Sequence, residues 1–310
     1  MHVLVLGSAA GGGFPQWNCN DKPSQRARAG DPQLLPRTQS SLAVSADGRR
    51  WALLNASPDM RQQISERHQL QPHPADPTRS SPIAAVVLTN ADVDHVAGLL
   101  TLRENQPFAL YAHARVLEVL AENSIFNVLN GEVVPRRTLP LDQPLALRDA
   151  DEQLLGLQIA AFAVPGKAAL WREDRTQPGF GTRDGDTIGL AIRAGDAGNT
   201  LFYVPGCAQM SEDLEQRLRG AALVFFDGTL WRDDEMVLQG VGKKTGRRMG
   251  HMSCSGPDGS MAAFENLEVS RKVFIHINNT NPLLETGSAE RAEAEKRGWE
   301  IAFDGMEIVL

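Results

Sequence analysis

The sequence lacks several features that define large classes of proteins. Its 310 residues include three cysteines, which are widely spaced and do not form a disulfide framework. The formal net charge is -7, which argues against a nucleic-acid binder because such a protein carries a basic face. No apolar run approaches the length of a membrane span, and no signal-type segment is present. We therefore expect a cytoplasmic protein that neither inserts into a membrane nor binds nucleic acid.

The sequence also lacks the Gly-x-Gly-x-x-Gly fingerprint of dinucleotide-binding proteins. A Gly-rich stretch at residues 7–13 does follow the first expected strand, but Phe14-Pro15 interrupts any helix that would begin there. A tight loop whose backbone approaches a ligand or another strand is the better interpretation. Internal repeats and low-complexity tracts are absent, and we treat residues 1–310 as one domain.

A polar elbow at the end of an apolar run is the most informative stretch that the sequence contains. The run from Ile83 to Leu88 is short and rich in β-branched residues, which predicts a buried strand. The turn after it carries a crowded polar set: Asn90, Asp92, Asp94 and His95. Carboxylates and imidazoles on one turn are natural ligands of a divalent metal. The alternative is a solvated loop whose aspartates cap the next helix.

Further strands and helices are predicted from the periodicity of apolar residues and from the residues typical of turns. We expect a hairpin of residues 38–44 and 50–54, and an antiparallel pair of 187–193 and 200–204. A helix is expected over 288–297 with Ser288 as its N-cap. The strands predicted at 299–303 and 306–310 are expected to form a closing hairpin around Asp304-Gly305.

Two residues near expected strand ends leave alternatives open. His276 lies among apolar residues of an expected strand, where a core histidine is the simpler interpretation and a metal ligand is the alternative. Cys207 follows the strand at 200–204, and both an inert buried thiol and a metal-binding thiolate fit this position.

The elbow resembles the His-x-His-x-Asp-His signature of the metallo-β-lactamase superfamily. Asp94 and His95 match its Asp-His pair, whereas Asn90 and Asp92 stand at the two leading histidines. The resemblance implies an α/β fold, the four-layer αββα metallo-β-lactamase sandwich. Because the leading histidines hold the first zinc of dizinc hydrolases, their replacement suggests a single metal with an oxygen-rich shell.

A closer resemblance extends along most of the chain. Residues 7–19, 55–59, 89–95, 204–208 and 276–282 together are similar to the pyrroloquinoline quinone (PQQ) biosynthesis protein B family. Many members carry a cysteine cluster that binds a structural zinc. Here Cys19 is followed by Asn20 and Asp21 without a partner cysteine nearby, which puts that zinc site in doubt.

The resemblance implies a function in making the cofactor PQQ, with a dipeptide or small-molecule precursor as substrate. We favour an iron-dependent oxygenase that hydroxylates the tyrosine of a Glu-Tyr-derived precursor, with one Fe(II) for which Zn or Mg can substitute in purified protein. The alternatives are a carrier of PQQ or its precursor towards the periplasm, and a metal-dependent hydrolase. The resemblance leaves room for other pathway proteins and a homodimer as partners.

The site residues that we predict fall into three groups. The metal ligands are Asp92, Asp94, His95 and His276. The proton-transfer pair, similar to that of ribonuclease Z-like members, is His251 oriented by Asp227. The substrate-binding residues are Asn90 beside the metal and, for substrate carboxylates, Lys167, Arg172 and Arg183.

Overall fold

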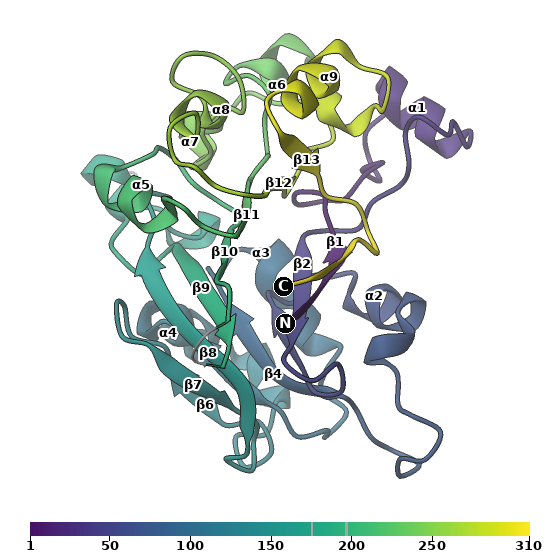
Figure 1. Cartoon of the computed structure of the whole chain (residues 1–310), viewed down its shortest axis with the longest axis vertical. Helices are drawn as coiled ribbons and strands as arrows, with labels where there is room; N and C mark the ends of the chain where they lie inside the picture. The colour runs from purple at the N-terminus through teal and green to yellow at the C-terminus, as the bar shows by residue number, and fades with distance from the viewer. Residues whose placement is uncertain (175, 196–197) are drawn as a thin grey trace.

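The computed structural model describes residues 1–174, 176–195 and 198–310, and in this part of the chain two seven-stranded sheets face each other (Figure 1). The first sheet has the strand order β14-β1-β2-β3-β4-β5-β6, and the second has the order β13-β12-β11-β10-β9-β8-β7. The strands of the first sheet are β1 His2–Gly7, β2 Ser41–Ser45, β3 Trp51–Leu54, β4 Ile83–Leu88, β5 Ala109–Ala112, β6 Arg136–Thr138 and β14 Glu307–Val309. The strands of the second are β7 Leu145–Arg148, β8 Leu154–Ala163, β9 Ile188–Ala194, β10 Leu201–Val204, β11 Leu223–Asp227, β12 Lys272–Ile275 and β13 Trp299–Ile301.

Nine helices in the described part of the chain cover the outer faces of the two sheets or lie in the loops at their edges. They are α1 Lys22–Arg28, α2 Met60–Glu66, α3 Val93–Val96, α4 Ala114–Glu122, α5 Glu212–Leu218, α6 Glu235–Leu238, α7 Gly246–Met249, α8 Ser260–Ala263 and α9 Ala289–Lys296. Short 3₁₀ turns lie at His68–Leu70, Ala97–Leu100, Ser124–Val128, Leu170–Arg172, Pro178–Gly181 and Pro282–Leu284. Within the described ranges, no helix is both long enough and apolar enough to cross a membrane.

Three apolar clusters define the layers. The central cluster combines residues of both sheets, such as Val87 of β4 and Phe225 of β11, and fills the space between them. A second cluster packs α2, α3 and α4 against the outer face of the first sheet. A third packs α1, α5, α8 and α9 against the outer face of the second sheet. The order of layers is therefore α, β, β, α, as the resemblance predicts.

Burial on both faces explains why the central strands read as unbroken apolar runs. Successive residues of a strand point to opposite faces, so Val87 enters the central cluster while Val86 and Leu88 enter the outer one. Phe225 and Phe226 of β11 divide in the same way. Each such fully buried side chain contributes about 1.5–3 kcal/mol of hydrophobic free energy.

Most local predictions are confirmed, and the closing hairpin is wrong. β2 and β3 pair antiparallel, as do β9 and β10, and Ser288 Oγ accepts a hydrogen bond from the Arg291 N–H at the start of α9. The last two strands, however, belong to different sheets. β13 runs parallel to β12 in the second sheet, and β14 runs antiparallel to β1 in the first. The turn at Asp304-Gly305 thus connects the two sheets.

Tight backbone packing holds the elbow after β4 in place. The Ala56 N–H donates to the His95 carbonyl over 2.7 Å, and the Gly98 N–H donates to the Ala56 carbonyl over 2.9 Å. A Cβ at Gly98 would lie 2.1 Å from the Ser57 carbonyl oxygen, so this contact requires glycine. The polar residues of the elbow are consequently anchored to the loop that follows β3.

We expect Gly98→Ala to destabilise the protein by roughly 1–3 kcal/mol, because the methyl group forces the elbow away from the backbone of the loop after β3. Urea unfolding followed by circular dichroism measures this change. Gly131→Ala is the matched control, since a Cβ there meets nothing within 4 Å. Equal unfolding midpoints for the two variants would contradict the packing argument.

Candidate metal centre

Most of the predicted site residues meet where both sheets present strand ends at one edge. β10, β11 and β12 run parallel, so their carboxyl ends share this edge. The elbow after β4 reaches the same edge because Asn90 forms an isolated bridge with Thr187, which precedes β9. The Gly-rich loop after β1 closes the group, since the Ala10 N–H donates to the Ile277 carbonyl over 2.8 Å. This close approach agrees with the interpretation of that loop as a tight turn near another strand.

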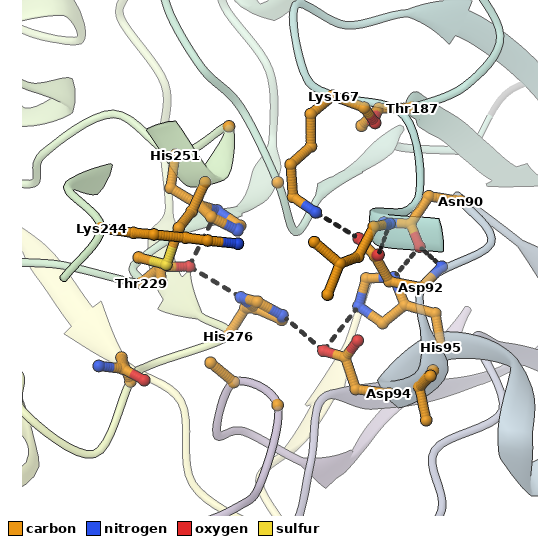
Figure 2. A pocket seen from close by; sticks show the side chains of 18 of the residues that line it. Asn90, Asp92, Asp94, His95, Lys167, Thr187, Thr229, Lys244, His251 and His276 are labelled. Carbon is orange, nitrogen blue, oxygen red and sulfur yellow. Dashed lines mark hydrogen bonds and ion pairs between the residues drawn. The ribbon is translucent and has the colours of Figure 1, made fainter. Parts of the chain in front are cut away.

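A cavity of about 380 Å³ opens over this edge (Figure 2). Its walls combine polar residues of the elbow and strand ends with apolar residues of the surrounding loops. The polar side chains that line it are Gln16, Asn90, Asp92, Asp94, His95, Lys167, Thr187, Thr229, Lys244, His251, His276 and Asn278. The apolar side chains are Ala10, Val93, Leu170, Trp171, Met236 and Met249.

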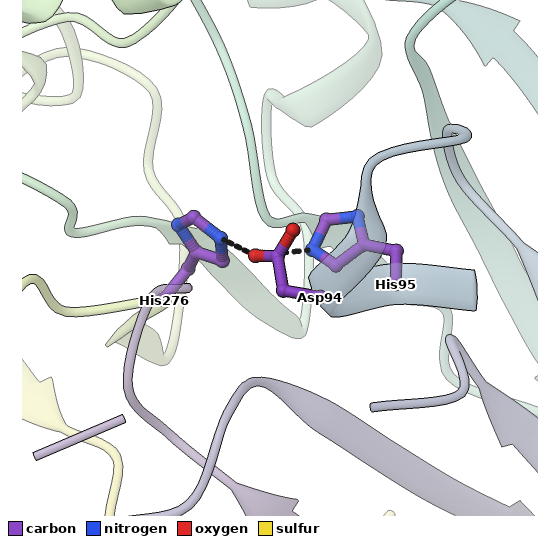
Figure 3. A group of neighbouring side chains, drawn as sticks. All are labelled: Asp94, His95 and His276. Carbon is purple, nitrogen blue, oxygen red and sulfur yellow. Dashed lines mark hydrogen bonds and ion pairs between the residues drawn. The ribbon is translucent and has the colours of Figure 1, made fainter. Parts of the chain in front are cut away.

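Asp94, His95 and His276 come together at one point of the cavity wall (Figure 3). Their potential ligand atoms lie within 4.8 Å of one another. Asp94 Oδ2 is 3.1 Å from His276 Nε2 and 3.8 Å from His95 Nε2. Atoms that share one metal ion lie at most about 4.4 Å apart, because each bond is about 2.2 Å long. These two contacts therefore suit a common ion.

The hydrogen bonds of His95 fix the position of its proton. Asn90 Oδ1 accepts from the Asp92 N–H over 2.9 Å, so this atom is an acceptor, and it lies 2.8 Å from His95 Nδ1. His95 Nδ1–H must then be the donor, which leaves a lone pair on Nε2. His95 Nε2 is buried and has no hydrogen-bond partner. Burial also lowers the pKa of His95, even though Asp94 opposes this, so the imidazole is neutral near pH 7.

The same argument places the proton of His276. Thr229 Oγ1 lies 2.6 Å from Asp227 Oδ1 and must donate its only proton to this carboxylate. It can then only accept from His276 Nδ1–H, which is 2.8 Å away. Nε2 of a neutral His276 thus directs a lone pair at Asp94.

Two imidazole lone pairs and a carboxylate consequently face each other, and this arrangement needs a positive charge. Burial raises the pKa of Asp94, but the neighbouring His95 and His276 outweigh this effect and lower it, so the carboxylate is ionised. A second proton on His276, whose pKa Asp94 raises against the effect of burial, would satisfy one contact only. It would leave Nε2 of His95 without a partner. A divalent cation satisfies both contacts, so the donor set fits a metal ion.

Asp227, His251 and Thr229 form a second polar group beside the first. Asp227 Oδ2 accepts from His251 Nδ1–H over 2.7 Å and from the Cys207 N–H over 2.8 Å. Its Oδ1 accepts from the hydroxyl and the N–H of Thr229. Four hydrogen bonds saturate this buried carboxylate, so it is suited to orienting His251 rather than to binding a metal. The His251 ring stacks on His276 with 5.2 Å between centroids.

The remaining predicted residues divide between the cavity and other places. Asp92 and Lys167 both face the cavity and form an ion pair of 3.4 Å. Asn90 contacts His95 as described. Arg172 and Arg183 are not among the residues that line the cavity, and Arg172 pairs with Glu122 over 3.0 Å. The geometry thus gives no support to these two arginines as carboxylate ligands.

The structure corrects the expected place of His276. β12 ends at Ile275, so His276 is not in the middle of a strand but is the first residue after it. Its φ of 61° lies in the left-handed region, which costs of order 1–3 kcal/mol for a residue other than glycine. This conformation turns the ring towards Asp94, and the surrounding structure maintains it.

The cysteines take no part in this centre. Cys207 is fully buried, and burial raises the pKa of its thiol. Of the two interpretations, an inert buried thiol and a metal-binding thiolate, these properties favour the inert thiol. Cys19 is in neither of the residue groups that could hold a metal in the described part of the chain.

Sequence reasoning missed five polar residues of the cavity wall, namely Gln16, Thr187, Thr229, Lys244 and Asn278. Thr229 follows Asp227 by two residues at a strand end, and this spacing was the signal that could have found it. Lys244 lies in a segment without any motif, and nothing in the sequence points to it.

Comparisons with known proteins agree with this geometry. Residues 50–277 match a family model described as the β-lactamase superfamily domain. The coenzyme PQQ synthesis protein B of Rhodopseudomonas palustris is 53% identical over 310 residues, covering 100% of both chains. That of Gluconacetobacter diazotrophicus is 55% identical over 306 residues, covering 99% of this chain and 98% of the relative.

A solved structure extends the likeness to three dimensions. The crystal structure of Zn(2+)-bound PqqB from Methylobacterium extorquens superimposes with a TM-score of 0.94 at 50% identity, and the match covers 100% of both chains. The predicted metallo-β-lactamase fold is thereby confirmed. On these matches, the chain belongs to the coenzyme PQQ synthesis protein B family of the β-lactamase superfamily.

Proposed function

We propose that this chain is an oxygenase of PQQ biosynthesis that hydroxylates the tyrosine ring of a Glu-Tyr-derived precursor with one Fe(II). The single observation that carries the proposal is the buried, unpartnered Nε2 of His95 opposite Asp94 and His276. Two histidines and one carboxylate with open positions are typical of non-haem Fe(II) oxygenases. The Zn(2+)-bound relative from Methylobacterium extorquens supports a metal here, while the iron is our inference.

Asp94, His95 and His276 would hold the ion, and Asn90 and Thr229 would orient the two imidazoles through their Nδ1–H groups. Bound there, Fe(II) supplies the activation of O₂ that ring hydroxylation requires. One oxygen atom would enter the ring and the other would leave as water, with two electrons from an added reductant such as ascorbate and two protons from the reductant or solvent. The predicted ligand Asp92 pairs with Lys167, so its membership of the shell stays a prediction.

The other cavity residues position the substrate and move its protons. His251 donates its Nδ1–H to Asp227, which leaves Nε2 free to accept a proton from the phenol. Trp171, Leu170 and Met236 provide an apolar wall for an aromatic ring. The cytoplasmic location, the single domain of residues 1–310 and a homodimer stay predictions.

His95→Ala and His276→Ala should each lose most of the bound iron, because each removes a lone pair that faces Asp94. Metal analysis after anaerobic purification from iron-supplied cells measures this, with about one iron per chain expected for the wild type. The exposed His68→Ala is the matched control. Full iron content in both centre variants would exclude this ligand set.

The iron-loaded protein should consume O₂ in the presence of L-Glu-L-Tyr and ascorbate, and the dipeptide should gain the mass of one oxygen atom. An oxygen electrode and mass spectrometry measure the two effects, with zinc-loaded protein as the inactive control. Stoichiometric binding of PQQ without any O₂ uptake would favour the carrier instead.

His251→Gln should keep its iron but lower the turnover number by roughly 10²–10⁴-fold, because it removes the proton acceptor that Asp227 orients. Iron content and O₂ uptake, measured on the same preparation, separate the two properties. Loss of iron in this variant would instead make His251 a metal ligand.

A further inference from the structure

A second lysine, Lys244, shares the cavity with Lys167. Lys167 lies in the segment after β8, whereas Lys244 lies just before α7, far away in the sequence. Figure 2 shows the two side chains extending into the same cavity from different segments. No ion pair of Lys244 is found among the residues that the structure describes, so its charge is available to a ligand.

Several contacts hold Lys167 in its place. Its ammonium group lies 3.4 Å from Asp92 Oδ2, and its carbonyl accepts from the Thr187 hydroxyl over 3.1 Å. The side-chain stem packs on the backbone of Gly250, where an added Cβ would lie 3.0 Å from Lys167 Cγ. Gly250 also has a φ of 84°, in the left-handed region. Glycine therefore suits this position both because of its backbone conformation and because a Cβ would crowd Lys167.

The backbone that carries Lys244 is also fixed relative to Lys167. Thr245 caps α7, and the Gly246 N–H donates to the Asp233 carbonyl over 2.8 Å. Arg248 of α7 forms a two-point ion pair with Glu173, which belongs to the same segment as Lys167. The Arg248 hydrogen bond is the main cause of the lowered pKa of Glu173, and the charges of Lys167 and Lys244 add to it.

The charges around the cavity specify the charge of a ligand. Asp92 and Asp94 are balanced by Lys167 and Lys244, and Glu173 is balanced by Arg248. A divalent ion held by Asp94, His95 and His276 adds two positive charges, and the buried Asp227 carboxylate beside this centre offsets one of them, which leaves an excess of one. A dipeptide that carries two carboxylates and one ammonium group has a net charge of -1 and neutralises this excess.

We infer that Lys167 and Lys244 form a two-point carboxylate-binding subsite that selects dicarboxylate derivatives of amino acids. Lys167 supplies a fixed charge, and the flexible side chain of the exposed Lys244 adapts to the second carboxylate. The inference rests on the proposed function for the ion and for the choice of ligand. It concerns binding, however, and not oxygenation.

The test measures ligand binding to zinc-loaded protein by isothermal titration calorimetry, so turnover plays no part. The ligands are L-Glu-L-Tyr, which has two carboxylates, and L-Gln-L-Tyr amide, in which both are replaced by amides. Lys244→Gln and Lys167→Gln should each weaken binding of the free acid by roughly 3- to 10-fold, with little effect on the amide ligand. The adjacent Lys243→Gln, which does not line the cavity, is the matched control.

Two results would overturn the subsite. One is an equal effect of Lys244→Gln and Lys243→Gln on the free acid, and the other is absence of measurable Glu-Tyr binding by the wild type. The outcome is independent of the oxygenase assay. Carboxylate-dependent binding without O₂ uptake by the iron form would exclude the oxygenase and support the subsite. O₂ uptake by the iron form, together with unchanged binding of L-Glu-L-Tyr in both lysine variants, would support the oxygenase and exclude the subsite.

Discussion

The centre depends on one electrostatic constraint, the need for a positive charge between Asp94 and the Nε2 atoms of His95 and His276. Asn90 and Thr229 create this need, because each accepts the Nδ1–H of one imidazole and so turns the lone pair of that ring towards the carboxylate. The neighbouring Asp227 contributes indirectly, since it takes the only proton of the Thr229 hydroxyl. Hydrogen bonds outside the centre thus determine what the centre can bind.

The fold satisfies this constraint by joining distant parts of the chain. Asp94 and His276 are 182 residues apart in the sequence and follow strands of different sheets, yet Asp94 Oδ2 lies 3.1 Å from His276 Nε2. The bridge between Asn90 and Thr187 fixes the two sheets at this edge, and the backbone contact at Gly98 fixes the elbow. The left-handed conformation of His276 is then maintained by packing on both sides, which offsets its local cost.

The sequence predicts those features that depend on local pattern. Apolar runs such as Ile83 to Leu88 specify strands that are buried on both faces, and the polar turn after this run specifies the elbow. The pairing of the last two strands could not be predicted, because the turn at Asp304-Gly305 has hairpin composition but connects two sheets. The position of Lys244 could not be predicted from the sequence either, since its place in the cavity depends on how α7 packs against a remote segment. The conformation of His276 depends on tertiary contacts in the same way.

The departure from the His-x-His pattern has a physical meaning in this structure. Asn90, at the first histidine position, accepts hydrogen bonds from the His95 ring and from the Asp92 N–H, so its oxygen orients a neighbouring group. Asp92, at the second, pairs with Lys167. Neither residue offers a nitrogen lone pair to a first metal, and both instead support groups that face the cavity. The two replacements therefore favour one ion and free the adjoining wall of the cavity for an anionic ligand, which a second metal position would otherwise occupy.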